Sequence, residues 1–219
     1  VDPNQLLCLD LCSGPFKSMS LAVNRHLDSS LAVTVDLEES FSSDVAADLR
    51  TWDLWGFLLD YCRCPGRRGL LRIPAHIHGS PPCQTYVLLN NLARHRTAAS
   101  PAAHAGSPAL EVEADACARM LCFLARQFQR HNLPTTFSIE NPRGSLLWAL
   151  PCMAALCRGP AAGLRCVSVD YCMYGAAVQK PTRLALSPAL AGAWPRRCDG
   201  TGRCGAMHAV SSSRAGAAT

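Results

Sequence analysis

Short apolar segments alternate with segments of helical periodicity along most of the chain, and this alternation restricts the fold more than any other feature of the sequence. Four apolar stretches end at polar or turn-forming residues, as buried strands do: 5–12, 30–36, 75–79 and 135–142. Helices are predicted between and after these stretches, over 16–27, 110–130 and 145–157. The pattern predicts an α/β fold with a mostly parallel sheet and helices on both faces.

Three further strands complete the predicted sheet. A weaker one is expected within 44–53, and two more within 164–175 and 182–187. Because the last two follow each other without a helix, we expect them to form an antiparallel pair at one edge. The clearest helix, 110–130, is predicted to bury one apolar face, made of Ala116, Met120, Phe123, Leu124 and Phe128.

The size and composition of the chain suit one domain with a sizeable hydrophobic core. Its 219 residues contain no apolar run of 18 or more, so we expect no membrane-spanning segment. We assign 1–187 to the main domain and 188–219 to a short Cys/His-containing segment with a disordered tail. Thirteen cysteines without a secretory signal indicate an intracellular, reducing compartment, either nucleus or cytoplasm. The net charge of +5 is compatible with nucleic-acid binding, although solvated basic loops explain it equally well.

Ligands of open α/β sheets bind beyond the carboxyl ends of the strands, and acidic residues stand at three of these ends. Asp10 is followed by a turn containing Gly14, where the backbone can approach a cofactor closely. Asp36 ends the second strand, at the position of an acid that binds ribose hydroxyls, and Asp48 lies in the third. The turn has no second glycine for a pyrophosphate, so a nucleoside cofactor fits better. Each acid is alternatively an ordinary cap or turn residue.

Cys83 follows the strand 75–79 directly behind Pro81 and Pro82, which stiffen the turn. A thiol fixed at the mouth of the sheet is a candidate nucleophile. Glu140 ends the next strand, and in a partly apolar pocket its carboxyl group would donate a proton to a ring nitrogen. Together they provide what conjugate addition to a pyrimidine ring requires. The alternative is that Cys83 is a turn residue and Glu140 a cap.

Six motifs, in this order, resemble those of the cytosine-5 DNA methyltransferases: LDLCSGP, VTVDLE, ADLRTWD, GSPPCQTY, FSIENP and YGAAVQKPTRLAL. They cover roughly residues 6–187. The resemblance implies a class I S-adenosylmethionine-dependent methyltransferase fold, which is Rossmann-like, with an antiparallel edge hairpin. It also implies a cofactor site formed by Asp10, Cys12, Gly14, Asp36, Leu37, Asp48, Leu49, Ser80 and Pro82.

The same resemblance implies the catalytic roles. Cys83 would attack carbon 6 of cytosine, and Glu140 would hold N3 and the amino edge. Arg183 would contact the carbonyl oxygen of the base, and Gln179 would order the site. The product would be 5-methylcytosine in nucleic acid, with DNA favoured over RNA, and the target base would be flipped out of its stack.

Two other readings of the sequence stay open. The segment SPPC also resembles the motif of cytosine-N4 and adenine-N6 amino methyltransferases, with Cys83 in place of the aromatic ring. A non-catalytic relative that binds nucleic acid or a partner protein is the third possibility, favoured by Pro181 where the family has an arginine. The chain resembles compact phage, viral and algal members that lack a full target-recognition domain, so a separate recognition subunit is a further expectation.

Smaller groups of residues complete the expectations. Cys198, Cys204 and His208 are candidate zinc ligands, with Cys172 as a fourth, or else free thiols in a poorly ordered tail. We expect His76 and His78 on opposite faces of their strand, in structural or solvent-facing positions rather than as a metal pair. A loop over 84–109 with Arg94 and Arg96 would close over the substrate, and the basic loop 63–72 would track the phosphate backbone.

Overall fold

The structure is a computed structural model that describes residues 6–12, 24, 30–36, 43–48, 51–54, 57, 73–87, 96–158, 163–174, 180–192 and 197–199. Two predicted features lie outside these residues: the helix over 16–27, apart from helical Asn24, and the basic loop 63–72. None of the helices in the described ranges combines the length and the apolar character needed to cross a bilayer.

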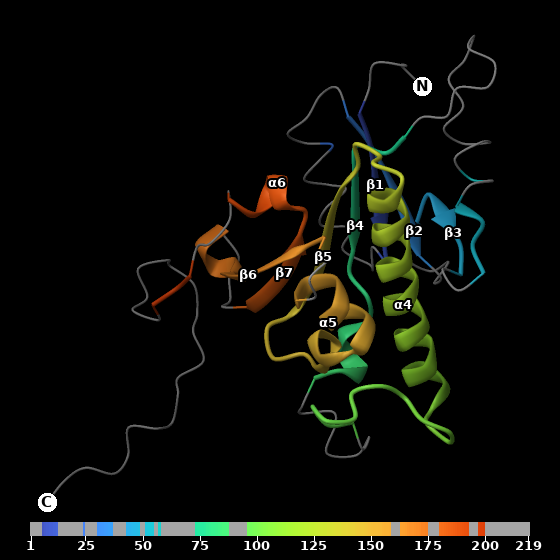
Figure 1. Cartoon of the computed structure of the whole chain (residues 1–219), viewed down its shortest axis with the longest axis vertical. Coiled ribbons are helices and arrows are strands. Elements are labelled where there is room, and N and C mark those ends of the chain that lie inside the picture. The colour runs from blue at the N-terminus through green and yellow to red at the C-terminus, as the bar shows by residue number, and fades with distance from the viewer. Residues whose placement is uncertain are drawn as a thin grey trace, which may run out of the picture.

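A seven-stranded sheet forms the centre of the molecule (Figure 1), in the order β3-β2-β1-β4-β5-β7-β6. Its strands are β1 (Leu6–Leu11), β2 (Ser30–Asp36), β3 (Val45–Ala46), β4 (His76–Gly79), β5 (Thr136–Pro142), β6 (Arg165–Asp170) and β7 (Pro181–Leu186). From β3 to β5 all neighbours are parallel. The predicted strand at 44–53 is confined to two residues, because the chain turns at Thr51, whose N–H donates to the Asp48 carbonyl at 3.0 Å.

The predicted antiparallel edge is confirmed, with one addition. β6 and β7 pair antiparallel, and β7 also pairs antiparallel with β5. The last strand in sequence is therefore inserted between the two strands that precede it. This insertion fixes which residues of β5 and β7 share a face, because cross-strand partners point to the same side of a sheet.

Two helices cover one face of the sheet (Figure 1): α4 (Ala109–Arg130) and α5 (Pro151–Arg158). The main core lies between them and the strands, with Leu9, Ile77, Phe128 and Phe137 almost fully buried. Gly79 permits the close approach of β4 to α4, since a Cβ atom there would lie 2.7 Å from Leu121 Cδ2.

The apolar face predicted for the helix over 110–130 is only partly correct. Leu124 and Phe128 are buried, and Met120 packs at the margin of the core. Phe123 is 53% exposed, which contradicts the prediction. The buried face is instead built from smaller residues of α4, including Ala114, Ala118, Leu121 and Cys122. Small side chains allow the helix to lie closer to the sheet, and Phe123 falls outside that stripe.

The helix predicted over 145–157 is divided. A 3-10 helix, η3 (Leu146–Ala149), ends at Leu150, and α5 begins at Pro151. Proline has no N–H to continue the hydrogen-bond ladder but is well placed at the first turn of a new helix. The Ser145 side chain accepts a hydrogen bond from the Leu147 N–H at 3.2 Å and caps η3.

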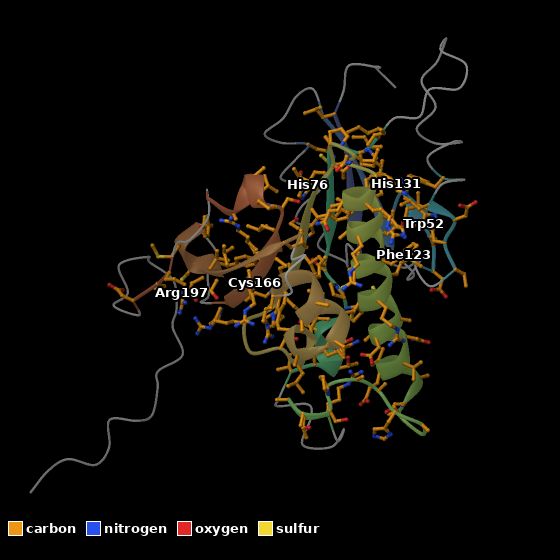
Figure 2. The ribbon with its side chains drawn as sticks, in the orientation of Figure 1. Trp52, His76, Phe123, His131, Cys166 and Arg197 are labelled. Atoms are coloured by element: carbon orange, nitrogen blue, oxygen red, sulfur yellow. The ribbon has the colours of Figure 1, made fainter. Side chains whose placement is uncertain are left out.

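The described part of the C-terminal segment packs on the β6–β7 edge. Helix α6 (Pro188–Ala191) places Leu190 against a small cluster of Val169, Leu184 and Leu186. Arg197 lies at the β6 edge of the sheet (Figure 2), where its Nε is 3.0 Å from Asp170 Oδ2. The same oxygen accepts the Cys198 N–H at 2.9 Å.

Candidate active site

The turn that follows β4 holds Cys83 at the carboxyl edge of the sheet. Cys83 begins a 3-10 helix, η2 (Cys83–Thr85), immediately after Pro82, and its side chain is exposed. The ends of the turn are fixed. The Ser80 N–H donates to the Leu11 carbonyl at 3.1 Å, and buried Tyr86 donates its hydroxyl to Asp115 Oδ1 at 2.6 Å. A rigid frame therefore presents one exposed thiol.

Asn141 joins this turn to the end of β5. Its Nδ2 donates to the Pro81 carbonyl at 2.8 Å, and the residue is 1% exposed. Because Asn141 follows Glu140 directly, one hydrogen bond sets the position of the carboxylate strand relative to the cysteine turn. The register agrees, since β4 and β5 pair in parallel up to Gly79 and Ile139, the residues just before Ser80 and Glu140. The sequence motif contained Asn141, but its bonding partner emerges only in the structure.

Glu140 has two polar neighbours, Lys180 and Tyr171. Lys180 Nζ lies 3.1 Å from Glu140 Oε1, and the ammonium also lies 5.1 Å from the centre of the Tyr171 ring. Burial raises the pKa of Tyr171, and the negative charge of Glu140 raises it further. The carboxylate therefore has a cation and a protonated phenol beside it, in addition to the apolar Leu184 that lies opposite it in β7. Neither neighbour was singled out in the sequence.

The structure does not bring Arg183 together with Glu140. In the β5–β7 register Glu140 lies opposite Leu184, and Arg183 lies opposite Asn141. Arg183 is therefore on the other face of the sheet, where its guanidinium carbon lies 5.5 Å from the centre of the Trp148 ring. Gln179, the remaining predicted catalytic residue, lies outside the described residues.

The carboxyl ends of β1 and β2 bring three of the predicted cofactor residues together. Asp10 is buried at the end of β1, and Asp36 is half-buried at the end of β2. Cys12 follows β1 directly, and its pKa is raised by a hydrogen bond with Cys117, by burial and, to a smaller extent, by the negative charges of Asp36 and Asp10. Its backbone has a φ of 58°, in the left-handed region, and its N–H donates to the Val35 carbonyl at 2.9 Å.

The other predicted cofactor residues are placed less completely. Ser80 and Pro82 lie on the cysteine turn, and half-buried Asp48 follows β3. Gly14, Leu37 and Leu49 lie outside the described residues. Two carboxylates around a tight turn suit a ligand with an amine and sugar hydroxyls, so the residues present fit S-adenosylmethionine in the chemistry of their donor groups.

A chain of hydrogen bonds runs along the sheet to Ser80. His76 contacts Thr136 Oγ1 and Ser138 Oγ, each at 2.8 Å. His78 contacts Ser138 Oγ at 2.7 Å and Ser80 Oγ at 2.9 Å. The expectation that the two histidines occupy opposite faces was wrong, because residues two apart in a strand share a face. They are structural, as expected, and they connect β4 with β5.

Burial lowers the pKa of His76 to about 4 and that of His78 to about 3, the latter with a smaller contribution from His76. We expect the free energy of unfolding to decrease as the pH falls from about 6.5, the ordinary histidine value, towards 4. In this window the two histidines bind protons in the unfolded chain but stay neutral in the native state. Urea unfolding at stepped pH measures the slope. A His76→Gln/His78→Gln variant controls for the carboxylates. If its slope matches the wild type, the histidines do not cause the effect.

Arg96 does not face a substrate, contrary to the expectation for the loop 84–109. It is 4% exposed, and its Nη1 donates to Asp115 Oδ1 at 2.7 Å and to the Pro101 carbonyl at 2.6 Å. Its guanidinium carbon also lies 4.6 Å from the centre of the Tyr86 ring. The buried carboxylate of Asp115, in the second turn of α4, attracts this arginine inward. Arg94 lies outside the described residues.

The predicted zinc site is tested only in part. Cys198 is half-buried beside Asp170, and Cys172 is buried in the 3-10 helix η4 (Tyr171–Tyr174). Cys204 and His208 lie outside the described residues, so the set of ligands stays a prediction. Within the part of the chain that the structure describes, no three His, Cys, Asp or Glu side chains form a group that could hold a metal ion.

Solved structures share this architecture. The chain is similar to a candidate DNA modification methyltransferase encoded within an E. coli prophage, with a TM-score of 0.51 and 16% identity over 89% of this chain and 52% of that one. It is also similar to a DNMT2 variant from Spodoptera frugiperda, with a TM-score of 0.50 and 14% identity over 89% of this chain and 54% of that one. The fold is that of the class I methyltransferases.

The likeness is one of structure. No family model and no curated protein sequence matches the chain. The chain spans about half the length of the solved structures named above. At these identities the comparison establishes the mostly parallel sheet with its antiparallel edge, and the chemistry has to be argued from the residues themselves.

Proposed function

We propose that this protein transfers a methyl group from S-adenosylmethionine to carbon 5 of cytosine in DNA, through a covalent adduct with Cys83. The observation that carries the proposal is the hydrogen bond from Asn141 Nδ2 to the Pro81 carbonyl, at 2.8 Å. It joins the rigid turn that carries an exposed thiol to the strand β5, in which Glu140 directly precedes Asn141. DNA is the favoured substrate because one solved structure with this fold is described as a DNA modification methyltransferase.

The chemistry assigned to the chain begins at Cys83. Its thiolate adds to carbon 6 of a cytosine flipped out of the duplex, which makes carbon 5 nucleophilic. Glu140 binds N3 and the amino edge of the base and stabilises the charge that develops on the ring. Lys180, at 3.1 Å from Glu140, keeps the carboxylate in place until the base arrives.

On the cofactor side, Asp10 and Cys12 lie at the end of β1, Asp36 lies at the end of the neighbouring strand β2, and Asp48 follows β3. We assign Asp36 to the ribose hydroxyls and Asp48 to the neighbourhood of the adenine. S-adenosylmethionine, when bound, supplies the methyl group. After transfer, a base removes the proton from carbon 5 and Cys83 leaves. Gln179 keeps its proposed role in ordering the site, whereas Arg183, on the opposite face of the sheet from Glu140, is not assigned a contact with the base.

The direct test is methyl transfer from labelled S-adenosylmethionine to DNA and RNA, followed by mass spectrometry of the nucleosides. We expect 5-methylcytosine in DNA. The same product in RNA alone would change the substrate but not the mechanism. N4-methylcytosine would move the protein to the amino methyltransferases. Cofactor binding without any product on varied substrates would contradict the proposal and favour a non-catalytic relative.

Glu140→Gln should lower the rate of methyl transfer about 10²- to 10⁴-fold, because the amide cannot take or give the proton that balances charge on the ring. The fold should persist, since the ion pair of Glu140 is with Lys180, whose side chain is 49% exposed. Single-turnover kinetics measures the rate, and calorimetry confirms that cofactor affinity is unchanged. A variant with the wild-type rate would remove Glu140 from the mechanism.

A further inference from the structure

Six of the cysteines in the described residues are arranged as three pairs of neighbouring thiols, although these cysteines are far apart in the sequence or on different elements. Cys12 and Cys117 have their sulfur atoms 2.9 Å apart. The thiols of Cys122 and Cys152 are neighbours, as are those of Cys157 and Cys166. The three pairs differ in accessibility, and only the last contains an exposed member, Cys166.

The fold brings Cys157 and Cys166 together from two elements. Cys157 lies in the last turn of α5, and Cys166 is the second residue of β6. The Leu164 N–H donates to the Leu156 carbonyl at 3.3 Å, which closes the connection between the two elements next to both cysteines. Cys157 packs half-buried against the main core, while Cys166 lies on the outer strand of the sheet near α5 (Figure 2).

Two arginines contribute positive charge near the exposed thiol of Cys166. In the β6–β7 register Cys166 lies opposite Ala185 and Ser168 lies opposite Arg183, so Cys166 and Arg183 are diagonal neighbours on one face. Arg158 follows Cys157 directly, and its Nη2 is fixed by the Trp148 carbonyl at 2.7 Å. The hydrogen bond from Cys157 and the charges of these arginines lower the pKa of Cys166 to about 7, against the effect of partial burial.

We propose that Cys157 and Cys166 form a peroxide-reactive dithiol, in which Cys166 is the attacking residue and Cys157 the resolving one. The Cys166 thiolate attacks one oxygen of a hydroperoxide and breaks the O–O bond, giving a Cys166 sulfenic acid and water or an alcohol. The Cys157 sulfur then attacks the sulfenic sulfur, and the S–O bond breaks as water leaves with the thiol proton. Two thiols are oxidised to one disulfide, and one hydroperoxide is reduced.

The Cys12–Cys117 pair is an internal control for proximity without reactivity. Its sulfur atoms are closely spaced at 2.9 Å, but Cys117 is 8% exposed. The hydrogen bond between the two thiols and burial raise the pKa of Cys12 well above its ordinary value. Proximity alone therefore favours oxidation of this pair, whereas thiolate availability and access favour Cys157–Cys166.

The experiment treats the reduced full chain with stoichiometric hydrogen peroxide, blocks free thiols with N-ethylmaleimide and identifies linked tryptic peptides by mass spectrometry. Cleavage separates 144–158, with Cys157, from 166–183, with Cys166, and 1–17 from 97–119 for the control pair. We expect the first two peptides to become linked about tenfold faster than the second two, because reactive thiolate is scarce at the buried pair. Fragment spectra assign the cysteines.

Single substitutions separate the two steps. In Cys157→Ser the sulfenic acid on Cys166 should persist and be trapped by dimedone, whereas Cys166→Ser should give neither adduct nor link. The proposal is overturned if Cys12–Cys117 or Cys122–Cys152 becomes linked first. It is also overturned if dimedone labels Cys83 and not Cys166 in the Cys157→Ser chain. These measurements require no methyl transfer, so they stand apart from the test of the proposed function.

Discussion

Replacing Cys83 with alanine is expected to reduce the formation of 5-methylcytosine by about 10⁴-fold or more, to background. The thiol is the group that would form the bond to carbon 6, and nothing else on the turn can take its place, because Gln84 carries an amide and Thr85 is buried. Cys83 is exposed at the start of η2, so its loss removes little packing. Activity should therefore fall while the free energy of unfolding stays within about 0.5 kcal/mol.

The matched control for this prediction is Cys166→Ser, which removes another exposed thiol. Cys166 lies in β6, far in sequence from the turn that carries Cys83. It should retain the wild-type rate in the same single-turnover assay. Persistence of 5-methylcytosine in Cys83→Ala would rule out the covalent mechanism. Equal losses in both variants would point to a general effect of removing thiols.

Asp115→Ala should be the most damaging single substitution for stability, costing about 3–5 kcal/mol. Asp115 is 1% exposed and accepts hydrogen bonds from Arg96, from the Tyr86 hydroxyl and, at 2.7 Å, from the Ala103 N–H. Alanine leaves the buried Arg96 and Tyr86 and the half-buried Ala103 N–H without this partner, and Arg96 is charged. Glu111, with Oε2 at 3.4 Å from Arg96 Nε, compensates only part of the charge.

A neighbouring arginine provides the comparison. Arg119 reaches the same carboxylate at 3.9 Å, but its side chain is 57% exposed, so Arg119→Ala should cost less than about 1 kcal/mol. Asp115→Asn, which keeps the shape and loses the charge, should fall between the two. Urea unfolding measures all three. If Asp115→Ala and Arg119→Ala lowered the free energy of unfolding by similarly small amounts, the buried hydrogen bonds of Asp115 would not stabilise the fold.

The fold could be predicted from the sequence because the pattern of apolar strands and helices is strong and local. The segment LLCLDL forms the buried strand β1, and the two close final strands form the antiparallel edge. The insertion of β7 between β5 and β6 could not be predicted, since nothing in Pro181–Leu186 specifies which neighbour it takes. Phe123 was misplaced because periodicity alone does not distinguish a large residue at the border of an apolar stripe from one at its centre.

The candidate site was predictable where a motif carries the chemistry and not where tertiary contacts decide. Cys83 was predicted from its position after a strand and Glu140 from its position at the end of the next one. The pairing of Arg96 with Asp115 was missed because the partners lie on different elements, and an arginine in a loop normally faces solvent. Lys180 lies between Gln179 and Arg183 in a motif from which only those two residues were predicted to act. Its contact with Glu140 depends on the strand order.

The position of β7 also has a consequence for folding during synthesis on the ribosome. The strands β5 and β6 leave the exit tunnel before β7, and neither can complete its pairing on the side that β7 will occupy until residues 181–186 follow. During that interval β5, with buried Phe137 and Ile139, presents an unpaired edge to other chains. Translation speed over the segment that follows β6 should therefore influence how much of the newly made chain escapes aggregation.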